Sequence, residues 1–337
     1  MRPARRRMLL AAAALAAAPL ARAQKPSRTA SLGILSFASE PTPEERANSP
    51  FLAKLKSLGW VEGRNLRIER AFAAGRTERL PQLAAGLVDK KVDVIWAVSL
   101  PAAIAAARAT RGIPIVFARL SWPVELGLAE SLARPGRNVT GIATIADRTA
   151  FAKPLEYLRE IVPGLKRVTI INPHRGLYKT VSGGEFSPIE DPGLKEIMGG
   201  LGLDFQRRYV ASVPDIDAAL AAALQSRADG LFVSTSPLLL GQTRRIVEFA
   251  LRHRLPSTFI ESPFVEAGGL LSYGSSVLGT ILESLEYVDA VLRGADPGEL
   301  PIRLPTKMEL AINLGTAKAL SLTVPQSLLL RADKLLE

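Results

Sequence analysis

The residues best placed to do chemistry lie in short polar segments that follow apolar, strand-like runs. These segments are Ser36-Phe37-Ala38-Ser39, Ser99-Leu100-Pro101, Ser121-Trp122-Pro123, Asn172-Pro173-His174, Ser234-Thr235-Ser236-Pro237, Glu261-Ser262-Pro263-Phe264 and Tyr273-Gly274-Ser275-Ser276. Their hydroxyl, amide and carboxylate groups can hydrogen-bond a polar ligand, and a helix that begins there directs free N–H groups toward an anion. Ser236-Pro237 and Ser262-Pro263 also fit a helix N-cap followed by proline, which needs no ligand. The segments therefore indicate ligand binding, with helix capping as the alternative for some of them.

Catalytic and metal-binding patterns are missing from the sequence. It contains no G-x-S-x-G, no G-x-x-x-x-G-K-[ST], no H-E-x-x-H and no complete G-x-G-x-x-G. The lack of cysteine excludes a thiolate site, and the two histidines, His174 and His253, are too few for a histidine-rich zinc site. His174 could act as a general base, although a solvated loop histidine is the commoner alternative, and His253 is interpreted as a surface residue near a helix end. We expect a protein that is not an enzyme and needs no cofactor or metal.

The elements that must position these segments alternate between short β-type runs and helical patterns, which is typical of βα units and a parallel sheet. Strands are predicted over 31–36, 65–70, 92–98, 115–118, 138–144, 167–171, 204–209, 230–233, 256–259, 270–273 and 308–313. Helices are predicted over 44–58, 79–89, 101–110, 127–133, 151–161, 193–201, 215–225, 238–252, 277–292 and 315–320. Ligands of open α/β sheets bind outside the carboxyl ends of the strands, so the polar segments should line a cleft.

Two parts of the chain repeat the same order of elements. Leu58-Gly59 precedes one strand as Leu201-Gly202 precedes another, and the run 92–99 resembles the run 228–234. The alternative is that any two βα series look alike. We predict an α/β fold with two similar Rossmann-like lobes, each built on a parallel sheet and joined by a hinge. The predicted lobes are 31–144 plus 274–300, and 145–273 plus 301–337.

The N-terminus has the features of an export signal. Residues 2–7 are basic, Met8–Leu20 is apolar, and Ala21-Arg22-Ala23 offers small residues at the positions that signal peptidase accepts. The apolar run is shorter than the roughly 20 residues that span a bilayer. We predict that residues 1–23 are a signal peptide and that the mature chain is periplasmic; a basic helix on a cytosolic protein is the alternative. Arg5-Arg6-Arg7-Met8-Leu9 fits a twin-arginine pattern as well, so both export routes stay open.

The net charge of +11 would be typical of a nucleic-acid partner, but five of the 43 Lys and Arg residues lie among the first 23 residues, which contain no acid. A transcription regulator would also need a helix-turn-helix ahead of the first strand, where only residues 24–30 remain after cleavage. We therefore expect no nucleic-acid partner. A ligand-sensing regulatory or signalling protein of the same fold stays an alternative, as does a periplasmic enzyme, because fold does not dictate function.

A series of ordered motifs runs through the chain. They are the segments 59–65 (GWVEGRN), 79–84 (RLPQLA), 126–128 (LGL), 131–141 (SLARPGRNVTG), 266–274 (EAGGLLSYG), 305–307 (PTK) and 312–320 (INLGTAKAL). With these motifs the chain resembles, over residues 31–337, the ABC-transporter substrate-binding family that includes tryptophan and tyrosine binding proteins. The resemblance implies a type I periplasmic-binding fold that closes on a small-molecule ligand and delivers it to an inner-membrane ABC permease. We expect a monomer.

The resemblance also implies which positions face the cleft. These are Ser36, Phe37, Ser99, Leu100, Ser121, Asn172, Ser234, Thr235, Glu261 and Tyr273. The chain departs from the family at Trp122-Pro123, where relatives commonly have Asp-Pro, and in the segment 174–189, where a short loop is expected. Trp122 joins the predicted ligand-binding set, with packing under the helix predicted at 127–133 as its alternative.

The predicted ligand combines an acid with an apolar or planar group. Helix N-termini after Ser99, Ser234 and Ser262 favour a carboxylate, and Glu261 could hold a ligand cation in place of the missing aspartate. Aromatic side chains that could hold a planar group are Phe37, Trp122, Phe264 and Tyr273. We therefore expect an amino-acid-like or aromatic carboxylate ligand.

Overall fold

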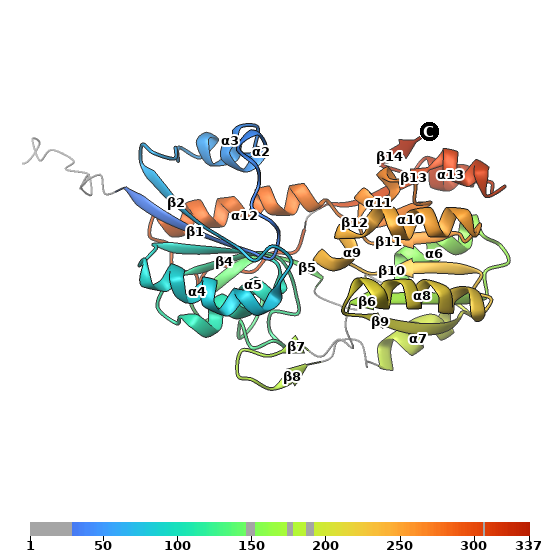
Figure 1. Cartoon of the computed structure of the whole chain (residues 1–337), viewed down its shortest axis with the longest axis horizontal. Coiled ribbons are helices and arrows are strands. Elements are labelled where there is room, and N and C mark those ends of the chain that lie inside the picture. The colour runs from blue at the N-terminus through green and yellow to red at the C-terminus, as the bar shows by residue number, and fades with distance from the viewer. Residues whose placement is uncertain (1–28, 146–151, 174–177, 187–191, 306) are drawn as a thin grey trace, which may run out of the picture.

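The first of two large β-sheets is built from the N-terminal part of the chain (Figure 1). The computed structural model describes residues 29–145, 152–173, 178–186, 192–305 and 307–337, so the predicted signal peptide lies outside the described residues. The strands of this sheet are all parallel and lie in the order β2-β1-β3-β4-β5. They are β1 (Ala30–Ser36), β2 (Leu66–Phe72), β3 (Val94–Val98), β4 (Ile115–Ser121) and β5 (Val139–Ile145).

The second sheet has the order β14-β13-β12-β11-β10-β6-β9 and is parallel except where β12 meets β13. Its strands are β6 (Arg167–Pro173), β9 (Asp204–Val210), β10 (Gly230–Val233), β11 (Ser257–Phe259), β12 (Leu271–Ser275), β13 (Met308–Asn313) and β14 (Lys334–Leu336). The two sheets confirm the predicted α/β class with parallel-sheet lobes. β14 was not predicted, because its exposed, charged start hides a strand pattern.

Helices cover both faces of the first sheet. They are α2 (Pro43–Ala47), α3 (Pro50–Ser57), the 3-10 turn η1 (Thr77–Arg79), α4 (Leu80–Asp89), α5 (Leu100–Ala109) and α12 (Val277–Leu292). On one face, α4 and α5 bury Leu87 and Ala103 in a core with Phe117. On the other face, α12 buries Leu285 and Val288, so a late segment of the chain completes the N-terminal lobe.

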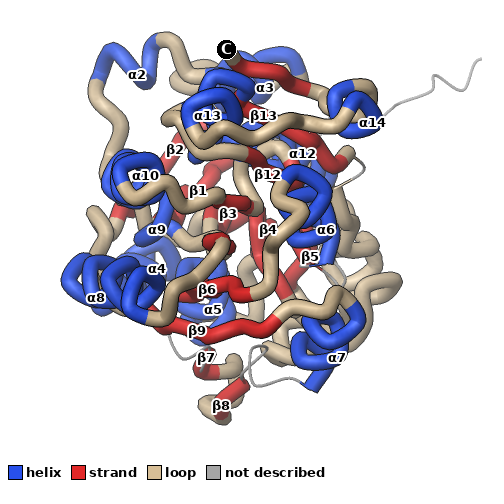
Figure 2. Tube along the Cα trace, turned by 90° about the vertical axis from the view of Figure 1, so that its right-hand side faces the viewer, coloured by secondary structure: helices blue, strands red, loops and turns tan. Residues whose placement is uncertain are grey.

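The second sheet is covered in the same way. Its helices are α6 (Ala152–Ile161), α7 (Pro192–Gly200), α8 (Val213–Gln225), α9 (Pro237–Gly241), α10 (Thr243–Arg252), α11 (Ser262–Glu266), α13 (Leu314–Ala319) and α14 (Gln326–Leu329). Figure 2 shows α8 and α10 on one side of this sheet and α6 and α7 on the other. Separate apolar cores fill the two sides, one around Leu158 and Ile170 and the other around Leu220 and Val247.

Three predicted helices differ in the structure. The helix predicted at 44–58 is divided into α2 and α3, because Pro50 starts a new helix. The helix predicted at 238–252 is divided at Gln242 into α9 and α10. The helix predicted at 127–133 is wrong: this segment forms turns, since Gly127 has a φ of +73° that a right-handed helix does not allow.

The chain passes between the sheets after β5, after β12 and before β13. Ser275 still pairs in the second sheet, and Arg303 still bridges to Ile142 of the first. These pairings lie close to the predicted lobe limits of 144, 274 and 300. The division into two lobes that move as bodies stays a prediction.

Candidate ligand-binding site

An ion pair joins the carboxyl ends of the two sheets. Arg119, near the carboxyl end of strand β4, donates from Nη2 to Oε1 of Glu261, which follows β11. Thr235, which follows β10, donates from Oγ1 to the same carboxylate oxygen. The Arg119 and Glu261 side chains are 12% and 2% exposed, so the pair is held out of water. The ends of the parallel strands therefore face one another, as expected for a cleft between two lobes.

Buried polar atoms without a hydrogen-bond partner gather at these strand ends. Among the described residues they include Ser99 Oγ after β3, Arg119 Nη1 in β4, Asn172 Oδ1 in β6 and Glu261 Oε2 after β11. An unsatisfied buried polar atom costs about 1–3 kcal/mol, and folded proteins contain few of them. Four such atoms from both sheets therefore mark a place where a polar ligand can complete the hydrogen bonding.

Neighbouring strand ends bring these atoms together. The backbone N–H of Ser99 donates to the carbonyl of Ala118, next to Arg119, over 3.2 Å. The backbone N–H of Ser234 donates to the carbonyl of Ile171, next to Asn172, over 3.0 Å. Ser99 and Arg119 thus form the side of the site from the first sheet. Asn172 and Thr235 form the opposite side, which Glu261 completes.

Three non-glycine residues on the side of the site formed by the first sheet have positive φ angles. Ser99 has φ +123° and ψ +158°, Arg119 has φ +62° and Trp122 has φ +56°. Non-glycine residues in this region are strained by about 1–3 kcal/mol and cluster at functional sites. Ser99 immediately precedes α5 but makes no side-chain cap bond, so its hydroxyl is not used by the helix.

Other predicted site residues take part in the local structure of the strand ends. Ser36 Oγ accepts from the Ala38 N–H over 3.2 Å, and Ser121 Oγ bonds Thr144 Oγ1 over 2.9 Å. Ser234 is buried at the end of β10. Phe37 and Leu100 are partly buried and pack against the first lobe's core. These contacts fix the positions of the residues within the protein. Their contact with a ligand stays a prediction.

The predicted aromatic set is only partly brought together. Phe264 is fully buried and stacks on Phe259 with ring centroids 4.5 Å apart, so the prediction that it faces the cleft is wrong. Tyr273 packs edge-on against Tyr157 at 5.2 Å, and burial raises the pKa of its hydroxyl. Trp122 is half-buried. The helix predicted at 127–133, under which Trp122 could have packed, is not formed. The aromatic side chains that could hold a planar group are thus reduced to Phe37, Trp122 and Tyr273.

Arg119 was not in the predicted set. The strand was expected to end at Ala118, whereas β4 continues to Ser121 through an irregular register with β5. The available signal was a lone arginine in an otherwise apolar strand, Ile115-Val-Phe-Ala-Arg-Leu120. A charged side chain inside a buried strand needs a partner, and that requirement points to an acid across the cleft.

A short hairpin between β6 and α7 contacts the helices and turns that pack on the first sheet. Strands β7 (Tyr178–Lys179) and β8 (Glu185–Phe186) pair antiparallel, within the segment that departs from the family pattern. The N–H of Val181 donates to the carbonyl of Leu126 over 3.0 Å, and Arg108 donates to the carbonyl of Thr180 over 2.7 Å. This insertion of the second lobe thus contacts the first. His174 lies outside the described residues.

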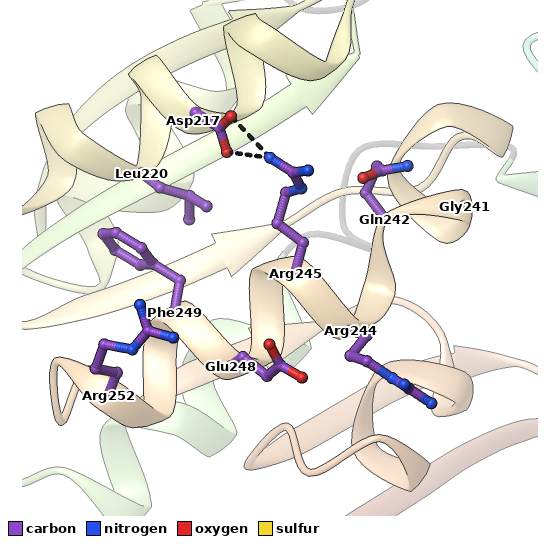
Figure 3. A pocket seen from close by; sticks show the side chains of 9 residues that line it. All are labelled: Asp217, Leu220, Gly241, Gln242, Arg244, Arg245, Glu248, Phe249 and Arg252. Carbon is purple, nitrogen blue, oxygen red and sulfur yellow. Dashed lines mark hydrogen bonds and ion pairs between the residues drawn. The ribbon is translucent and has the colours of Figure 1, made fainter.

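The described residues form no candidate metal site, and the one pocket described here lies away from the strand ends. Within the described ranges no group of three His, Cys, Asp or Glu side chains could hold a metal ion. His253 is exposed at the end of α10, which agrees with its interpretation as a surface residue. A groove of about 500 Å³ lies between α8 and α10 (Figure 3), where Arg245 bonds Asp217 over 2.8 Å. None of the strand-end residues lines it.

The architecture, with helices on both faces of two mainly parallel sheets, is that of the type I periplasmic-binding fold. Residues 31–336 match the family described as ABC transporter substrate binding protein. The chain belongs to this family, which confirms the resemblance that the sequence motifs indicated. In the part of the chain that the structure describes, no helix is long and apolar enough to cross a membrane.

Individual relatives agree with this assignment. The chain is 27% identical over 291 residues to a tyrosine-binding protein of Clostridioides difficile, covering 86% of this chain and 81% of that protein. It matches a conserved domain protein of Vibrio cholerae with 25% identity and a TM-score of 0.80, over 91% of this chain and all of the other. A structure from Streptococcus pneumoniae in complex with L-Trp is 21% identical, with a TM-score of 0.78 and the same coverage of both chains.

Proposed function

We propose that this substrate-binding protein captures an amino-acid-like or aromatic carboxylate solute between its lobes, outside the cytoplasm, and delivers it to an inner-membrane ABC permease. The observation that carries the proposal is the set of buried, unpartnered polar atoms at facing strand ends. The named ligands of the relatives, tyrosine and L-Trp, support the same class. In this proposal the chain acts as a monomer, by binding and not by catalysis, and without nucleic acid.

The proposed ligand contacts come from both lobes. Ser99 and Arg119 supply donors from the first, and Asn172, Thr235 and Glu261 supply the other side. The N-terminus of α5 adds partial positive charge behind Ser99, which favours a carboxylate. Ser36, Phe37, Leu100, Ser121, Trp122, Ser234 and Tyr273 complete the proposed lining.

The binding experiment is a thermal-shift titration of the purified mature chain with L-tyrosine, L-tryptophan and benzoate. A ligand at about one hundred times its Kd stabilises the native state by roughly 2.7 kcal/mol, which raises Tm measurably. Asn172→Ala removes one contact and should weaken binding about tenfold. The matched control is Asn48→Ala, at an exposed position of the first lobe, and it should leave binding unchanged. A bound solute that tolerates both Asn172→Ala and Ser99→Ala would refute the site.

Lobe closure is tested by small-angle scattering. A ligand that touches both lobes shifts the population toward a closed state, so the radius of gyration should fall on binding. An unchanged radius with saturating ligand would count against the two-lobe mechanism.

Export is tested by N-terminal sequencing of the protein from its native host. The mature chain should begin near Gln24, because residues 1–23 have the composition of a cleaved signal. A chain that keeps Met1 and stays in the cytosol would contradict this part of the proposal.

A further inference from the structure

We propose that the hairpin formed by β7 and β8 is a strap that holds the two lobes together in the solute-free protein, so that wide opening requires the hairpin to leave the first lobe. The hairpin lies in the segment where the chain departs from the family pattern. The inference goes beyond the proposed function, because it concerns the resting arrangement of the lobes and not the solute. It shares with that function only the premise that the lobes can separate.

The hairpin is joined to the second lobe by short connections. It follows β6, which ends at Pro173, and precedes α7, which begins at Pro192. Four residues separate Pro173 from Tyr178, and five separate Phe186 from Pro192. An extended chain spans at most about 3.6 Å per residue, so the hairpin cannot lie more than about 18 Å from Pro173 or about 22 Å from Pro192. While the hairpin stays docked on the first lobe, the separation of the lobes is therefore limited.

Polar and apolar contacts dock the hairpin on the first lobe. The N–H of Val181 donates to the carbonyl of Leu126 over 3.0 Å, and Arg108 Nη2 in α5 donates to the carbonyl of Thr180 over 2.7 Å. The Val181 side chain packs against the core that contains Leu126 and the apolar face of α5. The contact thus joins the hairpin to elements that pack directly on the first sheet.

The hairpin is a compact unit, so its docked residues cannot leave the first lobe independently of the rest. Tyr178 pairs with Phe186, and the N–H of Thr180 donates to the carbonyl of Gly184 over 2.8 Å. The N–H of Gly183 donates to the carbonyl of Thr180 over 2.9 Å. That carbonyl also accepts from Arg108, so the turn of the hairpin and its docking contact share one atom.

The position of the hairpin suits a strap. In Figures 1 and 2 the hairpin lies at the bottom of the molecule, and α12, where the chain enters the first lobe from β12, lies well above it. When two bodies rotate about a connection, points far from that connection separate most. A contact at the hairpin therefore opposes opening more effectively than an equal contact beside α12.

The test measures the distance between the lobes without solute. The chain has no cysteine, so Gln82→Cys in α4 and Ala218→Cys in α8, both at exposed positions, place one spin label on each lobe. Double electron–electron resonance on the full mature chain then gives the distribution of label distances. Val181→Asp places a carboxylate against the apolar core and should undock the hairpin. Loss of two hydrogen bonds and one apolar contact should raise the separated population about tenfold.

Three further variants make the test specific. The matched control is Ser182→Asp, which adds the same charge to the exposed turn of the hairpin and should leave the distances unchanged. Arg108→Ala removes one docking bond from the first-lobe side, so it should shift the distances in the same direction as Val181→Asp but less. Replacement of residues 178–186 by four glycines removes the strap altogether and keeps the test decisive if Val181→Asp does not fold.

Longer distances in Val181→Asp and in the glycine replacement, with none in Ser182→Asp, are the expected result. Unchanged distances in the glycine replacement, or an equal change in Ser182→Asp, would overturn the strap. Addition of L-tyrosine to the labelled, otherwise unmodified chain separates this failure from that of the proposed function. If L-tyrosine shifts the distances and the hairpin variants do not, lobe closure stands and the strap is wrong. If L-tyrosine does not bind, the strap is still tested, because its readout uses the solute-free chain.

Discussion

Replacement of Gly274 by alanine should displace the carboxyl end of β11, which Glu261 follows in the chain. A Cβ atom at this position would lie 1.9 Å from the carbonyl oxygen of Ile260, the residue directly before Glu261. Ordinary carbon–oxygen contacts lie at about 3.3 Å or more, so the two strands must separate by more than 1 Å. The backbone of Ile260 cannot rotate away as a flexible side chain could.

The magnitude follows from two costs. Overpacking in a filled core costs about 1–3 kcal/mol, and pushing β12 from β11 weakens the pairing of Phe259 with Ser272. We expect a loss of about 3 kcal/mol, which for a domain of this size corresponds to a Tm lower by roughly 6–12 °C. Solute binding should also weaken, because Glu261 moves with Ile260.

The assay is thermal unfolding followed by far-UV circular dichroism, with Gly86→Ala as the matched control. A Cβ atom at Gly86 in α4 meets nothing within 4 Å, so alanine should stabilise the helix by roughly 0.5–1 kcal/mol. The reasoning is refuted if Gly274→Ala melts within about 2 °C of the unmodified protein.

Two further predictions concern acid stability and the hairpin. The Leu310 N–H bonded to Asp333 holds the pKa of that carboxyl below its ordinary value, so its contribution to stability is present above the ordinary pKa and lost as pH falls through the lowered one. Asp333→Asn should therefore be less stable than the unmodified protein at pH 7, with a difference that vanishes in acid; urea titrations at several pH values check this, and a constant difference would contradict it. Val181→Asp should release the hairpin from the first lobe, because Val181 packs against that lobe's core, and limited proteolysis within 178–186 should accelerate; equal cleavage rates would argue against the docking.

Much of the fold could be predicted from local patterns. The buried parallel strand at 230–233 is a continuous apolar run, the one at 31–36 is apolar between its two serines, and both are followed by serine and proline. The failed helix at 127–133 shows the limit of the method, because its apolar residues are buried in turns. The positive φ at Trp122, which is not a glycine, has no signal in the sequence.

The candidate site was predictable where chemistry sits directly at a strand end, as at Ser99, Asn172 and Glu261. It was not predictable for Arg119, because its importance depends on which acid the other lobe places opposite. Phe264 failed for the converse reason, since an aromatic residue near a strand end is as suitable for the core beside Phe259 as for a cleft. Contacts between residues of the two lobes depend on the tertiary structure and cannot be predicted from local sequence patterns.

The most direct test of the central claim is a crystal structure of the mature chain with bound L-tyrosine. The account predicts the amino acid between the two sheets, with its carboxylate on Arg119 and Ser99 and its ammonium on Glu261 and Asn172. A ligand that contacts only one lobe, or that occupies the groove between α8 and α10, would contradict it.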